Sequence, residues 1–306
     1  MFLFIKKIVK FILKSFNFSL IKIQDSSFAD FQSLQKGKNF KERFRDVISD
    51  PVNIMISRVP HAGYLDQENN VFLHNGNRVP VGGKDAYYGE FSNLLIFNRG
   101  VHEPVEEYCF QEVLKKINSE NPCMIELGAY WGHYSMWFKK EFPDSRTILV
   151  ESDPANLDCG QFNFDLNGYQ GEFINQAVCK NQFEVDKFLF KEDIHKLEIL
   201  HSDIQGHEVE MLKHTSKSLN KKIINYLFIS THSEAIHSEV SEIIESHNYR
   251  IEVSSSFETH TTSFDGFILA TNSDIPRVFK NFHPMGRVEI LHATTNDLIN
   301  SITDIS

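Results

Sequence analysis

A short apolar segment followed by two glycines has the composition of a ligand-binding loop. Residues 123–135 read CMIELGAYWGHYS, so an apolar strand leads into a glycine loop that opens a helix. Gly128 permits a tight turn, and Gly132 lets the helix pack close to the strand. Glu126, a carboxylate at the mouth of the strand, suits an ammonium group on the ligand. The pattern predicts a strand–loop–helix unit that binds a small molecule.

A second carboxylate, Glu151, lies nineteen positions after Gly132, at the end of the apolar stretch 147–150. A carboxylate in this place can accept hydrogen bonds from both hydroxyls of a ribose. A dinucleotide-binding loop has the same outline, but there a middle glycine lets the backbone approach a diphosphate, and Tyr130 occupies that place here. S-adenosyl-L-methionine carries no phosphate, and its carboxylate can bind backbone donors at a helix start. The loop therefore favours this cofactor over NAD. The residues expected to contact it are Glu126, Gly128, Ala129, Tyr130, Gly132, Tyr134, Ser135, Glu151, Ser152, Ala177 and Asp203.

Asp203 and His232 each follow a predicted strand, and ligands bind at the carboxyl ends of the strands in a doubly wound sheet. We expect both side chains on the acceptor side of the crevice. Because a sulfonium donor is already activated, the protein must align the acceptor and remove its proton. Either residue can serve as the catalytic base, and His232 is slightly preferred because imidazole titrates near neutral pH.

The same strand ends allow other interpretations. Asp203, His232 and Asp265 offer an oxygen–nitrogen–oxygen set for a divalent metal, with Gln205 and Glu208 as further substrate or metal contacts. The spacing is no local metal signature and no HExxH occurs, so a metal is an alternative that the sequence does not favour. Asp203 and Gln205 could instead cap the following helix, and His232 could be a satisfied interior histidine.

Alternating helices and short apolar strands after Pro104 must position these side chains, a pattern typical of a parallel α/β sheet with helices on both faces. We expect a helix at 104–118 and strands at 123–127, 146–151, 172–177, 197–203, 225–231, 249–254 and 264–271. Before them, a helix at 40–49 and a hairpin around Asn75-Gly76, with strands at 71–74 and 77–81, indicate an N-terminal α+β cap.

These residues resemble the FkbM family of S-adenosylmethionine-dependent methyltransferases over residues 100–272. The resemblance rests on the strings IELGAYWGHYS at 125–135, VESDP at 150–154, DIQGHE at 203–208, FISTHS at 228–233 and FDGF at 264–267, with Glu103-Pro104 ahead of the first helix. It implies a Rossmann-like class I fold, a mostly parallel seven-stranded sheet with a reversed last strand. It also implies O-methylation of a sugar, a glycan precursor or a related small-molecule hydroxyl, as in polysaccharide biosynthesis. Gln205 and the short stretch between Ala177 and Leu197 depart from the commonest family pattern and leave the acceptor open.

The chain is expected to divide into a basic amphipathic helix at 1–25, the cap at 26–99, the methyltransferase-like domain at 100–272 and a C-terminal extension at 273–306. In residues 1–23, Lys6, Lys7, Lys10 and Lys14 fall on one side of a helix and apolar residues on the rest. Recurring lysines speak against a cleaved signal peptide or a spanning helix. The segment is suited to peripheral contact with an anionic membrane surface, or to packing on its own domain or on a second subunit in a homo-oligomer.

The composition of the chain limits the kinds of partner and the cellular compartment that we expect. A formal net charge of −10 argues against nucleic acid as a partner, because phosphate binding needs clustered Lys and Arg. Four cysteines without a CxxC pair fit a reducing cytoplasm, with any membrane contact at the inner face. Two other functions stay open: an NAD-dependent oxidoreductase or epimerase, disfavoured by Tyr130 and by the absence of a Tyr-x-x-x-Lys pair, and a catalytically silent cofactor-binding scaffold.

Overall fold

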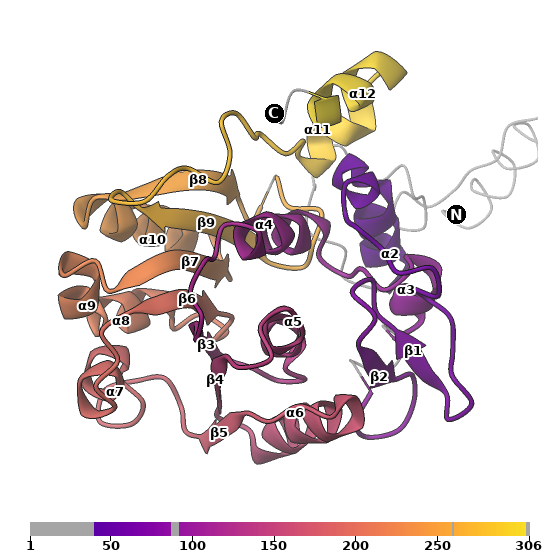
Figure 1. The fold of residues 1–306 in the computed structure, drawn as a ribbon. Coiled ribbons are helices and arrows are strands. Elements are labelled where there is room, and N and C mark those ends of the chain that lie inside the picture. Colours follow the sequence, from indigo (N-terminus) through magenta and orange to yellow (C-terminus); the bar gives the residue numbers. More distant parts are fainter. Residues whose placement is uncertain (1–39, 87–91, 259, 304–306) are drawn as a thin grey trace, which may run out of the picture. The chain divides into compact units, whose positions relative to one another are not determined.

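A seven-stranded sheet organises the described residues, which are 40–86, 92–258 and 260–303 of the computed structural model (Figure 1). Its strand order is β5-β4-β3-β6-β7-β9-β8, in which β9 runs antiparallel to both neighbours and all other pairings are parallel. The strands are β3 (Cys123–Leu127), β4 (Arg146–Glu151), β5 (Glu172–Asn175), β6 (Leu197–Ser202), β7 (Ile224–Thr231), β8 (Tyr249–Ser255) and β9 (Gly266–Asn272). This is the Rossmann-like class I fold with a reversed last strand, so the expected fold class is confirmed.

Helices cover both faces of the sheet, because successive side chains of its central strands enter two different apolar clusters. Met124 and Phe228 pack with helices α4 and α5 on one face, and Ile125 and Leu227 pack with helices α7 to α10 on the other. A strand that is buried on both faces is apolar throughout, which explains the unbroken apolar runs in the sequence. These helices are α4 (Pro104–Leu114), α5 (His133–Glu141), α6 (Pro154–Asn167), α7 (Val185–Lys191), α8 (Glu208–Lys213), α9 (Ser216–Asn220) and α10 (Glu234–Ser246).

Several expected elements are shorter than the sequence pattern suggested. The helix expected at 104–118 ends at Leu114, and the strands expected to reach 177 and 203 end at Asn175 and Ser202. The last strand begins at Gly266 rather than at 264. The residues that follow β5 and β6 therefore belong to loops at the carboxyl ends of these strands, where their side chains can face a ligand.

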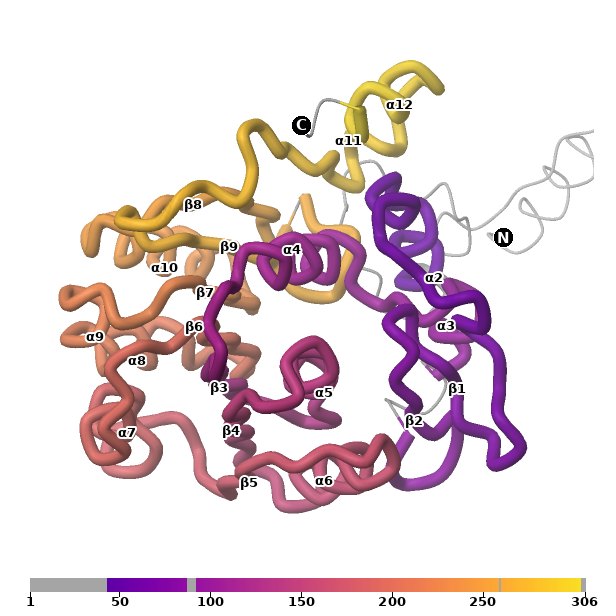
Figure 2. The backbone as a smooth tube through the Cα atoms, viewed as in Figure 1, coloured from indigo at the N-terminus to yellow at the C-terminus, as the bar shows by residue number. Residues whose placement is uncertain are grey.

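The cap contains α2 (Phe40–Ser49), the 3₁₀ helix η2 (Pro51–Ile54), the hairpin β1 (Asn70–Phe72) and β2 (Arg78–Pro80), and α3 (Ser92–Phe97). The helix at 40–49 and the hairpin were both expected, and Gly76 in the hairpin turn has a φ of +87°. Val71 and Leu73 of the hairpin are buried against Met136 of α5, so the hairpin packs on the helix that follows the glycine loop. Figure 2 traces this approach of the hairpin to the α5 and α6 side of the sheet.

The C-terminal extension joins the same core. Phe279 and Phe282 are buried beside Tyr108 of α4, and two short helices follow, α11 (Arg287–His292) and α12 (Thr295–Thr303). None of the described helices combines the length and the apolar character needed to cross a bilayer. The amphipathic segment expected at 1–25, with the start of the cap at 26–39, lies outside the described residues.

Candidate active site

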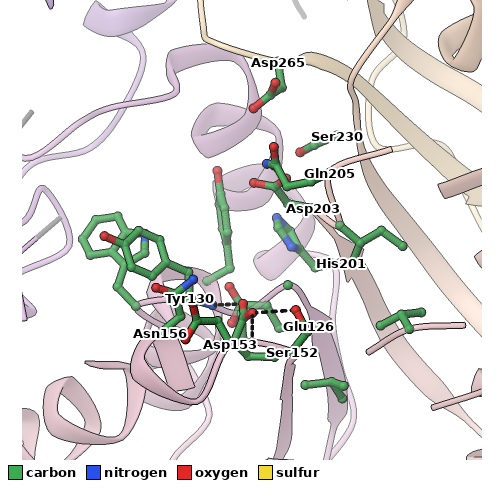
Figure 3. A pocket seen from close by; sticks show the side chains of 18 of the residues that line it. Glu126, Tyr130, Ser152, Asp153, Asn156, His201, Asp203, Gln205, Ser230 and Asp265 are labelled. Carbon is green, nitrogen blue, oxygen red and sulfur yellow. Dashed lines mark hydrogen bonds between the residues drawn. The ribbon is translucent and has the colours of Figure 1, made fainter. Parts of the chain in front are cut away.

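A pocket of about 560 Å³ lies at the carboxyl ends of the parallel strands, where the strand order reverses between β4, β3 and β6 (Figure 3). Ligands bind at this point in doubly wound sheets, and the volume is that of a site for a small molecule. Of the site residues that the sequence predicted, those lining the pocket are Glu126, Gly128, Ala129, Tyr130, Tyr134, Glu151, Ser152, Ala177, Asp203, Gln205 and Asp265. Those behind its wall are Gly132, Ser135, Glu208 and His232.

The glycine loop has the backbone conformation that its sequence requires. Gly128, Tyr130 and Gly132 all have positive φ, at 71°, 41° and 72°. A Cβ atom on Gly132 would lie 3.1 Å from Leu149 and 3.2 Å from Phe164. Gly132 therefore supports the pocket by allowing α5 to pack closely on β4 and α6, as expected, rather than by contacting a ligand.

The backbone donors of this loop are already used by the chain. The amides of Gly128 and Ala129 both donate to the carbonyl of Val150, at 2.8 and 3.1 Å. The amide of Ser135, in the first turn of α5, donates to Glu126 Oε2 at 3.0 Å. The chain's own Glu126 therefore binds the backbone donor of Ser135, and a contact between Ser135 and the cofactor stays a prediction.

Glu126 is buried between this helix start and the pocket. Burial raises the pKa of its carboxyl group, and the charge of His201 and the hydrogen bond from Ser135 oppose this shift only in part. Its side chain lines the pocket while one oxygen holds α5. The N-terminus of a helix can bind an anion, and the carboxyl group of Glu126 occupies that position at the start of α5. A ligand anion would therefore meet this carboxyl group there.

Glu151, at the end of β4, is held rigidly at the edge of the pocket. Its Oε2 accepts the amide of Tyr130 at 3.1 Å, and its Oε1 accepts the amide of Asp153 at 2.9 Å and the hydroxyl of Ser152 at 3.2 Å. A carboxylate has about four acceptor positions, two on each oxygen, so Oε2 can still accept a hydrogen bond from a ligand. The glycine loop and Glu151, which the sequence analysis recognised separately, are therefore joined by a direct hydrogen bond.

On the opposite side of the pocket, three carboxylates surround His232. Its Nε2 lies 3.1 Å from Asp203 Oδ1 and 3.5 Å from Asp265 Oδ1, and its Nδ1 lies 2.8 Å from Glu208 Oε1. Burial alone would lower the pKa of His232, but the contacts with Asp203 and Glu208 and the charge of Asp265 raise it to about 10. The reason for preferring His232 as the base is therefore wrong, because a protonated imidazole cannot accept a proton.

Asp203 is the more accessible member of this cluster. Its side chain is 34% exposed, against 11% for His232 and for Asp265. Gln205 donates to Asp203 Oδ1 at 3.0 Å, and α8 begins without a side-chain cap. Asp203 and Gln205 therefore bind each other instead of capping the helix. Ligand atoms of Asp203, His232 and Asp265 all lie within 4.8 Å of one another, so the sequence brought together the right residues for the metal alternative as well.

His201 lines the pocket and was not predicted from the sequence. Its Nε2 lies 2.6 Å from Glu106 Oε1, and both side chains are buried. Burial raises the pKa of Glu106 well above its usual range, and burial likewise lowers the pKa of His201. The two residues lie 95 positions apart, and no local pattern in the sequence indicates their contact.

The far wall of the pocket comes from the cap and from the segment before α4. Tyr134 donates to Glu103 Oε2 at 3.1 Å, and His102 Nε2 lies 3.3 Å from the same oxygen. Although burial opposes both shifts, the opposite charges of this pair raise the pKa of His102 to about 10 and lower that of Glu103 to about 2. Phe264 is 41% exposed, and the guanidinium of Arg43 lies 4.5 Å from the centre of its ring. Tyr134 was expected from the glycine loop, and Glu103 and Phe264 belong to strings that carry the resemblance, whereas His102 and Arg43 had no sequence signal.

Comparisons with known proteins gave distant structural matches alone. No family model and no curated protein matches the chain. A precorrin-6y C5,15-methyltransferase from Geobacter metallireducens is 14% identical, with a TM-score of 0.40 over 53% of this chain and 88% of its own. M. capricolum TrmK, solved with S-adenosyl-homocysteine, is 14% identical, with a TM-score of 0.39 over 61% and 75%. A protein of the NADB-Rossmann superfamily from Streptococcus agalactiae is 9% identical, with a TM-score of 0.37 over 60% and 72%.

Proposed function

We propose that the chain is an S-adenosylmethionine-dependent methyltransferase that methylates a hydroxyl group of a sugar or a related small molecule. The observation that carries this proposal is Glu126, whose carboxylate binds the first turn of α5. A dinucleotide would place its diphosphate near that helix start, where it would meet a carboxylate and find the amides of Gly128 and Ala129 already bound. A cofactor without a diphosphate avoids the larger cost, the placement of two phosphate groups beside a carboxylate.

The charge of the pocket also fits this cofactor. Glu126, Glu151 and Asp203 line it from three neighbouring strand ends, and such carboxylates attract a ligand that carries a sulfonium and an ammonium group. Glu151 would accept a ribose hydroxyl at Oε2, with its orientation already fixed by Tyr130 and Asp153. When bound, the cofactor supplies an activated methyl group.

Asp203 is the better candidate for the base. Its Oδ1 is held by Gln205 and by the imidazolium of His232, while the carboxylate remains a third exposed at the pocket. In the transfer, the acceptor oxygen forms a bond to the methyl carbon as the bond between that carbon and sulfur breaks, and the proton of the hydroxyl passes to Asp203. His232 would then position Asp203 rather than take the proton. The exposed ring of Phe264 offers an apolar surface for one face of a sugar.

The proposal is tested first by binding and then by turnover. Calorimetry should show that the full-length protein binds S-adenosylmethionine and S-adenosylhomocysteine, and that it does not bind NAD. Gly132→Val should abolish this binding, because a branched side chain would collide with Leu149 and Phe164 at a positive φ. Binding of NAD alone would overturn the proposal.

A panel of sugar, nucleotide-sugar and lipid-linked sugar acceptors, assayed by release of S-adenosylhomocysteine, then tests the chemistry. Turnover on one of these classes would support the assigned acceptor. Cofactor binding without turnover on any class would instead support the silent scaffold. Activity that survives exhaustive chelation would reject an essential metal at Asp203, His232 and Asp265.

A further inference from the structure

Three buried side chains from three separate segments meet between the cap and the sheet. His74 lies in the turn that joins β1 to β2, Glu107 in α4, and His133 at the first position of α5. Their exposed fractions are 1%, 0% and 1%. Ligand atoms of all three lie within 4.8 Å of one another. The group is distinct from the strand-end cluster around His232, which comes from other elements.

The polar atoms of this group are not satisfied by hydrogen bonds. Among the described residues, neither ring nitrogen of His74, neither ring nitrogen of His133, nor Glu107 Oε2 has a hydrogen-bond partner. His74 Nε2 is nevertheless only 3.0 Å from Glu107 Oε2, and His133 Nε2 is 3.9 Å from Glu107 Oε1. Buried polar atoms normally have partners, and leaving them without one is costly. Atoms that converge without bonding each other indicate a shared ligand.

We propose that His74, Glu107 and His133 bind a divalent transition-metal ion, for which zinc is the best match. Two imidazoles and one carboxylate are a common protein ligand set for zinc, with water in the fourth position. Tetrahedral ligands of zinc lie roughly 3.3 Å apart, and the 3.0 Å between His74 Nε2 and Glu107 Oε2 is close to that value. Calcium and magnesium are poor matches because they prefer oxygen ligands.

The surroundings hold the proposed ligands in place. Glu107 Oε1 accepts the backbone amides of His102 and Glu103, at 2.8 and 3.1 Å, which fixes the carboxylate and leaves Oε2 turned toward His74. Such outer contacts orient metal ligands in known sites. The ring of His133 stacks on Trp131 at 5.0 Å between centres, which fixes its plane.

The bound ion would fasten the hairpin to the cofactor loop. His74 is held to the segment before α4 through its amide, which donates to the carbonyl of Gly100 at 3.3 Å. Gly100 has a φ of +83°, and a Cβ atom there would overlap the backbone of Leu73 and His74. A metal that joins this turn to α4 and to the first residue of α5 therefore crosslinks cap and loop, which are far apart in the sequence.

Metal analysis of the full-length protein tests the proposal. After expression with added zinc and dialysis into metal-free buffer, the wild type should retain about one zinc per chain. His74→Ala and Glu107→Gln should each retain little or none. Glu107→Gln can still accept the amides of His102 and Glu103, so it tests ligation with little change in packing. A strong chelator should lower the midpoint of thermal unfolding of the wild type by roughly 5–10 °C, and added zinc should restore it.

Two control variants make the result specific. His61→Ala removes an exposed histidine of the same cap and should leave the zinc in place. His232→Ala should also leave it in place, since His232 belongs to the other cluster. If the zinc is lost from His232→Ala and kept by His74→Ala, the proposal is overturned. It is equally overturned if the wild type takes up no zinc in titration, which would make the group an ion pair of protein side chains alone. Neither outcome bears on cofactor binding.

Discussion

The two groups of histidine and carboxylate side chains in this protein differ in composition and in exposure. Around His232, one imidazole faces three carboxylates at the rim of the pocket, and Asp203 remains a third exposed. Around Glu107, one carboxylate faces three imidazoles, those of His74, His102 and His133, and all four side chains are buried. Excess carboxylate keeps an imidazole protonated, whereas excess imidazole around one buried carboxylate suits a metal. We therefore propose catalysis for the first group and structural support for the second.

The largest effect is expected on turnover, from Asp203→Asn. This change keeps the shape of the side chain and removes the proposed base, so the rate of methyl transfer should fall about 10²–10⁴-fold. The affinity for S-adenosylmethionine, measured by calorimetry, should change little because the acceptor side is affected. A variant that turns over normally on an identified acceptor would show that Asp203 is not the base.

The second effect concerns stability and should separate the two groups. Glu107→Ala leaves buried histidines and the amides of His102 and Glu103 without their partner, and removal of one member of a buried ion pair costs about 3–5 kcal/mol. Urea unfolding of Glu107→Ala should show this loss. Glu112→Ala, on the same helix, removes a pair with the exposed Lys115, worth about 1 kcal/mol or less, and one hydrogen bond from Gln111, worth about 1 kcal/mol. Equal losses in both variants would contradict the distinction between the groups.

The sequence was sufficient for the positions that depend on neighbouring residues. Apolar runs located the strands, and the order of β3, its glycine loop and β4 placed Glu126 and Glu151 at one edge of the sheet. The carboxyl ends of β6 and β7 brought Asp203 and His232 together for the same reason. The sequence could not show which side chains would surround His232, so the raised pKa of this residue could not be predicted. For the same reason, the sequence could not show that Asp203 is a better candidate for the base than His232.

The missed residues share one physical cause. Glu106 meets His201 across 95 positions, and His74 meets Glu107 only because a hairpin of the cap folds onto α4 and α5. Such contacts are set by how elements pack, and a single sequence contains no local pattern for them. A second contact of Glu126 was missed for a similar reason. Its position was expected, but its hydrogen bond with Ser135 depends on how α5 docks against β3.

A third, smaller effect is expected on the affinity for the cofactor. It concerns Glu151, on the side of the pocket opposite Asp203. Glu151→Ala removes the proposed hydrogen bond between a charged acceptor and the ribose, a loss of about 1.5–3 kcal/mol, or about 10–150-fold in affinity. Calorimetry with S-adenosylhomocysteine measures it directly. Glu172→Ala is the matched control, because Glu172 is a glutamate of the adjacent strand β5 that binds Arg146 away from the pocket. Unchanged affinity in a folded Glu151→Ala protein would remove Glu151 from the cofactor site.

The smallest effect is a pH dependence that distinguishes the imidazolium of His232 from a neutral histidine. In the folded protein the pKa of His232 is raised to about 10, from a usual value of 6.5. A group whose folded-state pKa is raised stabilises the fold fully below its unfolded pKa and loses that contribution as the pH rises through the folded pKa. The advantage of the wild type over His232→Gln in free energy of unfolding should therefore be largest near pH 6 and should decrease toward pH 10.

The decrease should be roughly 1–2 kcal/mol, less than the pKa shift alone would give, because water reaches Asp203 and screens part of its attraction. Urea unfolding of both proteins at several pH values measures the difference, in which the titration of all other groups largely cancels. His195→Gln, at an exposed position, is the control for the loss of a surface histidine. An advantage that stays constant between pH 6 and pH 10 would mean that His232 is neutral in the folded protein. His232 would then again be a candidate for the base, together with Asp203. The group around His232 and the group around Glu107 would in that case differ only in their exposure to solvent.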